Sequence, residues 1–456
     1  MNTIVTLKKG EGRTIKSGGA WVYDNEIDTI TGRFTNGDMV RVHDFDGYDM
    51  GVGFINQNSH IRVRMLSRKP GAVVDSDFLY ERVRAAWNYR KAVMPMEDLN
   101  CARLIFGEAD WLPGLVVDKY ADVLVVESLA LGMDRLKEEI LSDLTSLMEA
   151  DGYPVRGIYE RSDAMVRKKE GMEPFKGFLY AGESEHEKPH EKAESHFFNY
   201  SEFDTNIEIT ENGVHYLVDV VNGQKTGFFL DQKYNRLAMQ KICRGLLSAK
   251  GPGEEIRVLD CFTHMGTFAL NCGLALSEEK DKLMGSLEGS KGAIAGSKNV
   301  HASVLGLDIS EYAISQAQAN AVGNGLSDIV DFRCANVLDE LPKLYEAGER
   351  YDVVILDPPA FTKSREATKN AIKGYREINM KGLKLVRDGG FLATCSCSHF
   401  MTQELFVKTI SQAAASVHKR LRQVELRTQA CDHPILWSAD ESYYLKFLIF
   451  QVCEEK

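Results

Sequence analysis

Residues 256–262 read IRVLDCF and residues 304–310 read VLGLDIS, and they open a series of short apolar runs that alternate with helical periodicity. The series predicts strands at 256–262, 304–310, 328–337, 351–359, 391–398 and 443–452, and helices at 266–276, 311–325, 376–390 and 402–417. This alternation is typical of a parallel, doubly wound sheet. Ligands of such sheets bind at the carboxyl ends of the strands. The sequence therefore predicts an α/β, Rossmann-like domain that begins near residue 205.

Polar residues lie where four of these strands end. The first strand runs into Asp260 and Gly266, the second ends in Asp308, the third at Asn336 and the fourth at Asp357. An acid after the second strand can accept both hydroxyls of a ribose, although Asp308 could also cap the next helix and Asn336 could be a turn residue. The first loop is not GxGxxG and no lysine follows it, which excludes a dinucleotide fingerprint and a phosphate loop. The four residues together favour a cofactor site.

The first half of the chain follows other patterns. MVRVHDF (39–45), YDMGVGFIN (48–56) and HIRVRMLS (60–67) are separated by turn signals, which predicts a small β-barrel over 1–72. Residues 73–204 mix strands and helices and predict a small α+β middle domain.

The third domain spans 205–456. Its first elements are expected to be strands at 211–220 and 225–232 and a helix at 232–247. Residues 277–303 are rich in Gly, Ser and Lys and are interpreted as an inserted surface loop.

Composition narrows the class of protein. The chain has 456 residues, a net charge of −11 and no apolar run long enough to span a membrane. Its nine cysteines form no CxxC pair, so neither a metal site nor a disulfide framework is expected, and a cytoplasmic location fits. His186, His190 and His196 could bind a metal, but an exposed loop is the better reading of their polar surroundings. The acidity argues against tight non-specific binding along phosphate backbones.

Several motifs along the chain resemble one family. They are GGAWVYDNEI (18–27), GEADWLPGLVVDKY (107–120), GFFLDQKYNR (227–236), DCFTHMGTFAL (260–270), DPPAF (357–361), TCSCSHF (394–400) and DHPILWSADESYYLK (432–446). The chain resembles the RlmI-type family of large-subunit ribosomal RNA cytosine-5 methyltransferases. Members join an N-terminal PUA domain, a small middle domain and a class I S-adenosylmethionine-dependent methyltransferase domain.

The resemblance implies a role for each matching residue. The methionine part of S-adenosylmethionine would be lined by Asp260, Phe262, Thr263 and Gly266. Asp308 would hold the ribose, Asn336 would lie by the adenine where family members often have Asp, and Gln232 would lie close to the cofactor. Asp357 would face both the cofactor and the target base. The partners implied are large-subunit ribosomal RNA and a second copy of the chain in a homodimer.

The barrel is expected to hold the RNA. Arg62, Arg64 and Arg68 are evenly spaced, so a strand would present all three on one face, beside Lys69. A solvated strand face is an equally good reading of that spacing. The PUA-like resemblance favours contacts to RNA shape and phosphates.

The chemistry expected of the family requires a reactive thiol. Attack of a thiolate on C6 of cytosine makes C5 nucleophilic toward the methyl group, which is covalent catalysis. Cys395 and Cys397 both lie at the end of the strand next to DPPAF, and Cys397 is nearer the carboxyl end and matches the family's S-C-S. The catalytic residues expected are therefore Cys397 and Asp357. Lys363 and Lys373 could lower the pKa of the thiol.

Three alternatives remain open at the level of sequence. DPP also resembles motifs of amine methylases, so a ribosomal guanine methyltransferase would need no cysteine. The chain could be an RNA-binding protein with an inactive methyltransferase fold. A metal or redox sensor that uses Cys395 and Cys397 has too few ligands for zinc and ranks last.

Overall fold

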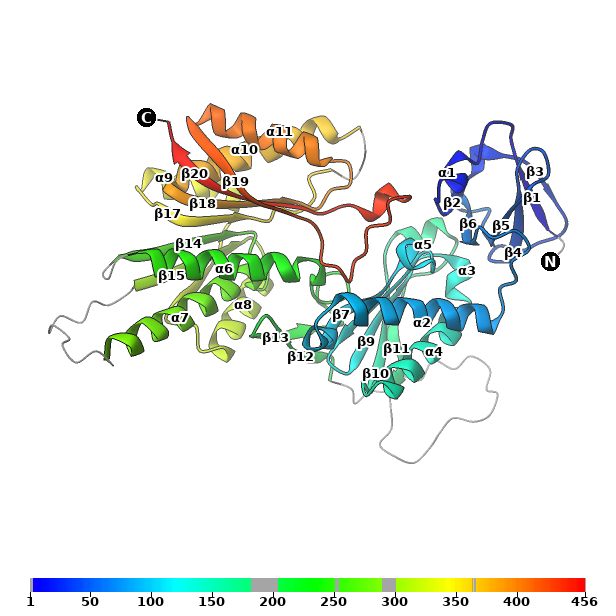
Figure 1. The fold of residues 1–456 in the computed structure, drawn as a ribbon, viewed down its shortest axis with the longest axis horizontal. Helices are drawn as coiled ribbons and strands as arrows, with labels where there is room; N and C mark the ends of the chain where they lie inside the picture. The colour runs from blue at the N-terminus through cyan, green and yellow to red at the C-terminus, as the bar shows by residue number, and fades with distance from the viewer. Residues whose placement is uncertain are drawn as a thin grey trace. The chain divides into compact units, whose positions relative to one another are not determined.

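The computed structural model describes residues 3–181, 204–250, 254–288, 301–362, 364 and 366–455. The chain forms two compact units (Figure 1). The first contains Met1–Ile209, Val218–Asp231 and Cys431–Ser442, and the second contains Thr210–Leu217, Gln232–Ala430 and Tyr443–Lys456. Each unit is therefore assembled from segments that are far apart in the sequence.

The first unit begins with a six-stranded sheet in the order β2-β6-β5-β4-β1-β3. Its elements are β1 (Ile4–Leu7), α1 (Arg13–Lys16), β2 (Trp21–Tyr23), β3 (Ile27–Thr31), β4 (Met39–His43), β5 (Asp49–Ile55) and β6 (Ile61–Ser67). Val5, Val40, Val42 and Val63 alternate with more exposed residues and are fully buried in its core. Alternation of period two thus gives a six-stranded sheet in the region where the turn-rich sequence predicts a small β-barrel.

The same unit contains a five-stranded sheet in the order β11-β10-β9-β8-β7. Its elements are α2 (Ser76–Val93), β7 (Cys101–Phe106), β8 (Leu115–Tyr120), β9 (Val123–Ser128), α3 (Leu131–Asp134), α4 (Lys137–Ala150), β10 (Gly157–Ser162), α5 (Val166–Lys169) and β11 (Phe175–Ala181). Helices α2 and α4 pack together, and the core around Trp87 also includes Phe54 and Leu66 of the first sheet. The first sheet therefore contributes Phe54 and Leu66 to this second core, while Val5 and its neighbours form a separate core.

The second unit contains a seven-stranded sheet in the order β16-β15-β14-β17-β18-β20-β19. Its strands are β14 (Glu255–Cys261), β15 (His301–Asp308), β16 (Val330–Cys334), β17 (Tyr351–Leu356), β18 (Val386–Ser396), β19 (Lys419–Arg427) and β20 (Lys446–Glu454). The first five are parallel, and β20 is antiparallel to both neighbours. The strand order reverses between β14 and β17, which is where such sheets bind ligands.

Helices cover both faces of this sheet (Figure 1). They are α6 (Lys233–Ala249), α7 (Thr267–Glu288), α8 (Glu311–Gly323), α9 (Val337–Glu346), α10 (Thr368–Leu385) and α11 (Gln403–Ser416). The first three lie on one face and the last three on the other. The doubly wound α/β prediction is confirmed, and the hairpin of β12 (Asn206–Glu211) and β13 (Val214–Asp219) precedes it.

The structure corrects three predicted elements and adds a strand that was not predicted. Residues 277–288, expected in a surface loop, continue α7 because Glu, Lys and Leu are good helix formers, while 289–300 lie outside the described residues. Residues 225–232 form turns and a 3-10 turn rather than a strand, since Gly227 adopts a φ of 131°. Helix α10 ends at Leu385, so 386–390 belong to β18. Strand β19 was not predicted, because its Lys- and Arg-rich alternation resembles a solvated segment.

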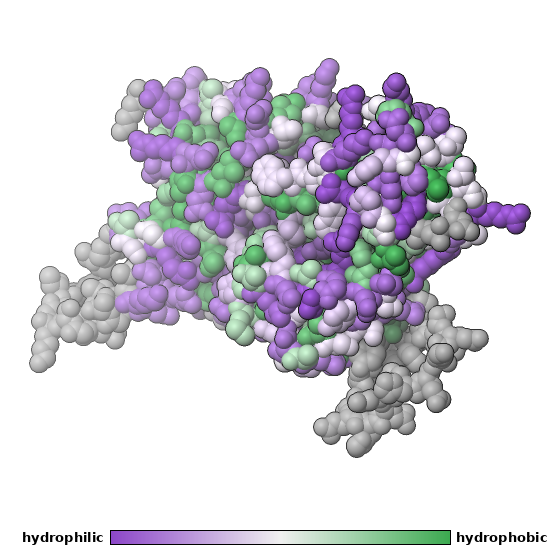
Figure 2. All heavy atoms as spheres, turned by 45° about the vertical axis from the view of Figure 1, so that its right-hand side comes forward, coloured by the Kyte–Doolittle hydropathy of each residue, from purple (hydrophilic) through white to green (hydrophobic). Residues whose placement is uncertain are grey.

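Of the residues that the structure describes, none belongs to a helix long and apolar enough to cross a membrane. On the face drawn in Figure 2, hydrophobic side chains are interspersed with hydrophilic ones. The expected polar loop 181–200, including His186, His190 and His196, lies outside the described residues except for Ala181.

Candidate active site

Asp260 lies near the end of β14 and is fully buried. Its Oδ2 accepts hydrogen bonds from the Thr263 hydroxyl at 2.5 Å and from the Ala269 amide at 3.0 Å, while its Oδ1 has no partner among the described residues. Burial raises the pKa of Asp260 to about 7, and the negative charge of Asp357 adds to the shift. A buried carboxylate oxygen without a donor is costly, so it fits a ligand that brings a donor or a positive charge.

The loop after β14 has an unusual backbone. Phe262 and His264 have φ values of 64° and 52°, and Gly266 has 84°. The Thr263 amide donates to the Leu307 carbonyl, and the His264 amide donates to Asp308 Oδ2, both at 2.9 Å. Left-handed backbone at bulky residues persists only where neighbours hold it, and it concentrates at binding sites. The loop is thus fixed against the end of β15.

Asp308 is the last residue of β15, and Asn336 lies just beyond the end of β16. Asp308 Oδ1 accepts from the Ser310 amide at 2.9 Å, and Asn336 caps α9 by accepting from the Leu338 amide at 3.1 Å. The N-cap of α8 is therefore Ser310 rather than Asp308, and Asn336 caps a helix rather than forming a turn. A carboxylate has two acceptor positions on each oxygen, and the Asn336 amide nitrogen still offers donors, so both residues can also contact a ligand.

Asp357 joins the end of β17 to the end of β18. Its Oδ1 accepts from the Cys395 thiol at 2.5 Å, and its Oδ2 accepts from Gln232 Nε2 at 3.2 Å. Gln232 Oε1 in turn accepts from Asn235 Nδ2 at 2.6 Å, and Asn235 Oδ1 accepts from Arg427 Nε at 3.1 Å. A continuous polar network therefore orients the Asp357 carboxylate. It includes Gln232, which is the residue expected near the cofactor.

Cys395 lies in β18 and Cys397 lies just beyond the end of this strand, and their environments differ. Cys395 is fully buried, and burial together with the charge of Asp357 raises its thiol pKa well above the usual value. Cys397 lies one residue beyond the strand and is partly exposed. A reactive thiol needs access and a neighbourhood that favours its thiolate, and a buried thiol beside a carboxylate has neither. The geometry therefore favours Cys397 over Cys395 as a nucleophile.

Hydrogen bonds hold the backbone on both sides of Cys397. The Ser396 hydroxyl donates to Tyr375 Oη at 2.9 Å, and the Ser398 hydroxyl donates to the Thr362 carbonyl at 3.0 Å. Lys446 Nζ donates to the Ser398 carbonyl at 2.5 Å. Burial lowers the pKa of Lys446 to about 8, and the nearby Cys397 and Cys395 oppose that shift. Lys446 thus places a cation beside the S-C-S turn.

Lys446 is the main functional residue that sequence reasoning missed. Its signal is a lysine within the apolar strand sequence YYLKFLIFQV, where a charge is buried only when it has partners. The two lysines named in its place are less suitable, because Lys373 is exposed and Lys363 lies outside the described residues. Asn235 and Arg427 were missed too, since their contacts to the site depend on tertiary packing.

The expected RNA-binding residues have different surroundings. Arg64 is buried and pairs with Glu108 at 3.2 Å and with Glu170 at 3.1 Å, so its charge is used within the first unit. Arg62 is partly buried and donates to the Asn56 carbonyl at 3.3 Å. Arg68 and Lys69 lie beyond the end of β6 and are exposed. The even spacing therefore does not make three equivalent surface cations.

The carboxyl edge of the second unit's sheet fits a cationic cofactor. Asp260, Asp308 and Asp357 are close enough for the two others to raise the pKa of Asp260. An ammonium or sulfonium group would relieve this repulsion and supply the missing partner of Asp260 Oδ1. Over the part of the chain that is described, no group of three or more His, Cys, Asp or Glu side chains could hold a metal ion.

Residues 5–68 match the PUA-like domain family, and residues 284–447 match the Methyltransferase domain family. The chain is 34% identical to ribosomal RNA large subunit methyltransferase I of Pseudoalteromonas translucida over 99% of this chain and 100% of that one. It is 33% identical to the protein of the same name from Alteromonas mediterranea over the full length of both. The chain belongs to the ribosomal RNA large subunit methyltransferase I family. This is the family predicted from its motifs.

Solved structures agree with the fold expected for the ribosomal RNA large subunit methyltransferase I family. A Streptococcus mutans chain described as a SAM-dependent methyltransferase superposes with a TM-score of 0.70 at 16% identity and covers 98% of this chain and 99% of its own. A methyltransferase complexed with SAH superposes with a TM-score of 0.71 over the same shares at 16% identity. The fold and the class of cofactor, S-adenosylmethionine, are those predicted from the sequence.

Proposed function

We propose that this chain methylates C5 of a cytosine in large-subunit ribosomal RNA, with S-adenosylmethionine as methyl donor and Cys397 as nucleophile. The observation that carries the proposal is the partly exposed Cys397 thiol, held between two anchored serines at the sheet edge that also presents Asp260, Asp308 and Asp357. Its relatives carry the name of a ribosomal RNA large subunit methyltransferase. Their name supports the choice of RNA.

Each residue has a role in the cofactor site. Asp260, with the backbone of Phe262, Thr263 and Gly266, holds the amino-acid end of the cofactor, Asp308 holds its ribose and Asn336 its adenine. Gln232 and Asp357 line the side toward the base. When bound, S-adenosylmethionine supplies a methyl group on a sulfonium.

The reaction uses the thiol twice. Cys397 Sγ forms a bond to C6 of the base, so that electron density at C5 takes up the methyl group. Transfer of the C5 proton to solvent then lets the electrons of the C5–H bond re-form the C5–C6 double bond as the S–C6 bond breaks, which restores the aromatic ring and the thiolate. The Lys446 ammonium favours the thiolate of Cys397 before attack and after release. Asp357 forms a hydrogen bond to N3 or N4 of the target base. This base must leave its stack in the RNA to enter the site.

The test is methyl transfer from labelled S-adenosylmethionine to unmodified large-subunit ribosomal RNA, followed by nucleoside digestion. We expect labelled 5-methylcytidine, and a loss of roughly 1000-fold or more in rate for Cys397→Ala. Cys395→Ser is the matched control, since it removes the neighbouring buried thiol of the same strand but keeps a hydroxyl that can donate to Asp357; it should retain most activity.

Other products separate the alternatives. A labelled guanosine derivative that persists in Cys397→Ala would replace the proposal with a guanine methyltransferase that needs no cysteine. No label, together with no binding of S-adenosylmethionine, would indicate an RNA-binding protein with an inactive methyltransferase fold. RNA that carries 5-fluorocytidine gives an independent readout, because the fluorine cannot leave as a proton does and the wild-type enzyme should remain covalently attached.

A further inference from the structure

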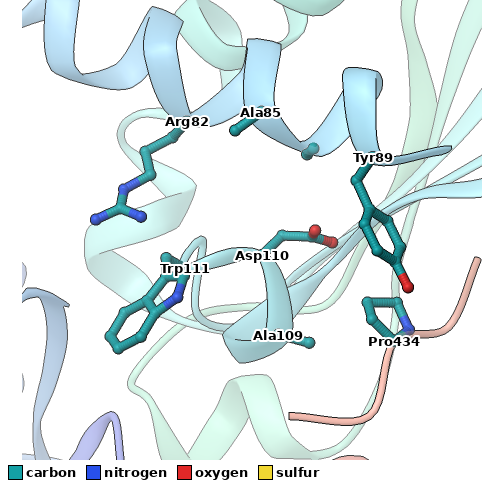
Figure 3. A pocket seen from close by; sticks show the side chains of 8 residues that line it. Arg82, Ala85, Tyr89, Ala109, Asp110, Trp111 and Pro434 are labelled. Carbon is teal, nitrogen blue, oxygen red and sulfur yellow. The ribbon is translucent and has the colours of Figure 1, made fainter. Parts of the chain in front are cut away.

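The first unit contains a pocket of about 430 Å³ lined by Arg68, Lys69, Arg82 and Trp111. A second pocket of about 200 Å³ continues past Arg82 and Trp111 to Tyr89 and Pro434 (Figure 3). Figure 3 shows Arg82 and Trp111 at one end and the Tyr89 ring at the other. The larger volume lies in the range of small-molecule sites. The two pockets share Arg82 and Trp111, which belong to α2 and to the GEADWLPG sequence.

Trp111 is held in an unusual conformation. It ends the 3-10 turn Gly107–Asp110 with a φ of 59°, a region that a bulky residue rarely adopts. The Trp111 amide donates to the Glu108 carbonyl at 3.2 Å, and Leu112 and Leu115 behind it are fully buried. Residues in such conformations concentrate at ligand sites, where the surrounding structure holds them. The indole is thus presented at the pocket rather than packed in the core.

The cations around the indole differ from most arginines of the first unit in having no acidic partner among the described residues. Arg68 and Arg82 lie 5.3 Å and 5.5 Å from the Trp111 ring centre. Arg68, Lys69 and Arg82 form no ion pair with a carboxylate within the described part of the chain. Asp110, which lines the smaller pocket, pairs with the buried Arg90 at 2.6 Å and is thereby neutralised. The pocket therefore has a net positive field that an anionic ligand would satisfy.

We propose that this Trp111 pocket binds one nucleotide of the single-stranded RNA that flanks the target base. Trp111 stacks on the base, and Arg68, Lys69 and Arg82 contact the adjoining phosphates. Stacking on an aromatic ring within a positively charged groove is how proteins hold single-stranded nucleic acid. This inference rests on the proposed RNA substrate and adds a recognition residue, Trp111, that lies in the middle domain rather than in the PUA-like sheet.

The test measures binding of the full-length chain to a fluorescein-labelled single-stranded RNA dodecamer by anisotropy. Trp111→Leu should weaken binding about tenfold or more, and Trp111→Phe, which retains a ring, should restore most of it. Arg82→Gln should weaken binding and reduce the slope of log Kd against log salt by about 0.7. Arg84→Gln is the matched control, because Arg84 lies on the same helix, pairs with Glu81 and lines neither pocket.

The outcomes separate this inference from the proposed function. Equal affinities of wild type and Trp111→Leu, or no binding of the oligonucleotide by wild type, would overturn the pocket. Either result would leave methyl transfer and its dependence on Cys397 intact. Conversely, loss of RNA binding in Trp111→Leu with unchanged cofactor binding supports the pocket even if the methylated base is not cytosine. In methyl-transfer assays the pocket predicts a raised KM for RNA with kcat nearly unchanged, which misfolding would not produce.

Discussion

Two regions of the molecule use charge in opposite ways. One is the carboxyl edge of the sheet in the second unit, and the other is the Trp111 pocket in the first unit. At the edge, Asp260 is buried and its Oδ2 accepts two hydrogen bonds from the chain, while each carboxylate oxygen of Asp308 accepts one. At the pocket, Arg68 and Lys69 are exposed, and no carboxylate of the described chain pairs with them or with Arg82. The first arrangement is built to fix one small ligand. The second is built to attract a chain of phosphates.

Burial explains why these two regions should respond differently to mutation. Removing a desolvated charge alters folding and binding together, because its partners then remain buried without an opposite charge. Removing a hydrated cation alters binding with little effect on folding, because water takes its place. The contrast between the two regions can be tested by substituting single residues in each of them.

Arg64 gives the largest expected effect. Arg64→Gln leaves Glu108 and Glu170 without their shared cation, so the free energy of unfolding of the first unit should fall by about 3–5 kcal/mol. Arg68→Gln, only four residues away, should change it little. Urea unfolding followed by tryptophan fluorescence measures both. Equal losses in the two variants would remove the distinction between buried and hydrated arginines.

Asp260→Asn should separate binding from stability in the second unit. The folded pKa of Asp260 is about 7, above the ordinary 3.8, so the folded chain holds an extra proton between these values and its stability falls as pH rises through them. An asparagine has no charge to bury, so the Tm of the variant at pH 8 should be roughly 2–4 °C above that of the wild type. At pH 4, where Asp260 is protonated in the folded chain, we expect no gain. Affinity for S-adenosylmethionine should fall about 10- to 100-fold. A lower Tm at pH 8 would show that the carboxylate stabilises the empty site.

Lys446→Met gives the smallest expected effect of the three. It removes the cation next to Cys397 with little change in volume, so the pH profile of methyl transfer should move about one unit upward and the rate at pH 7 should fall about tenfold. Activity should recover at higher pH. Alkylation by iodoacetamide follows the same thiol without RNA when it is measured on the peptide that contains Cys397, because Cys334, Cys431 and Cys453 are also accessible. An unchanged profile would limit Lys446 to anchoring the Ser398 carbonyl.

The sequence predicts the second unit better than the first, for a physical reason. Asp260, Asp308, Asn336 and Asp357 each follow an apolar strand, and parallel strands bring their carboxyl ends to one edge, so local pattern alone assembles the site. The Trp111 pocket combines β6, α2 and the turn after β7, which only tertiary packing brings together. Arg64 was misleading for the same reason, since nothing local indicates that Glu108 and Glu170 would neutralise it.

The segment Cys431–Ser442 has a consequence for the order in which the chain can fold. Asp432 and His433 are buried in the first unit, where Asp432 Oδ2 accepts from the Arg103 amide at 2.9 Å and the Asp432 carbonyl accepts from Arg90 at 2.8 Å. These contacts span more than 300 residues of sequence. During synthesis, Arg90 and the Arg103 amide therefore lack these partners until the ribosome has passed residue 432, and contacts of such long range form slowly. Until then Arg90 keeps Asp110 as its ion-pair partner but lacks the Asp432 carbonyl.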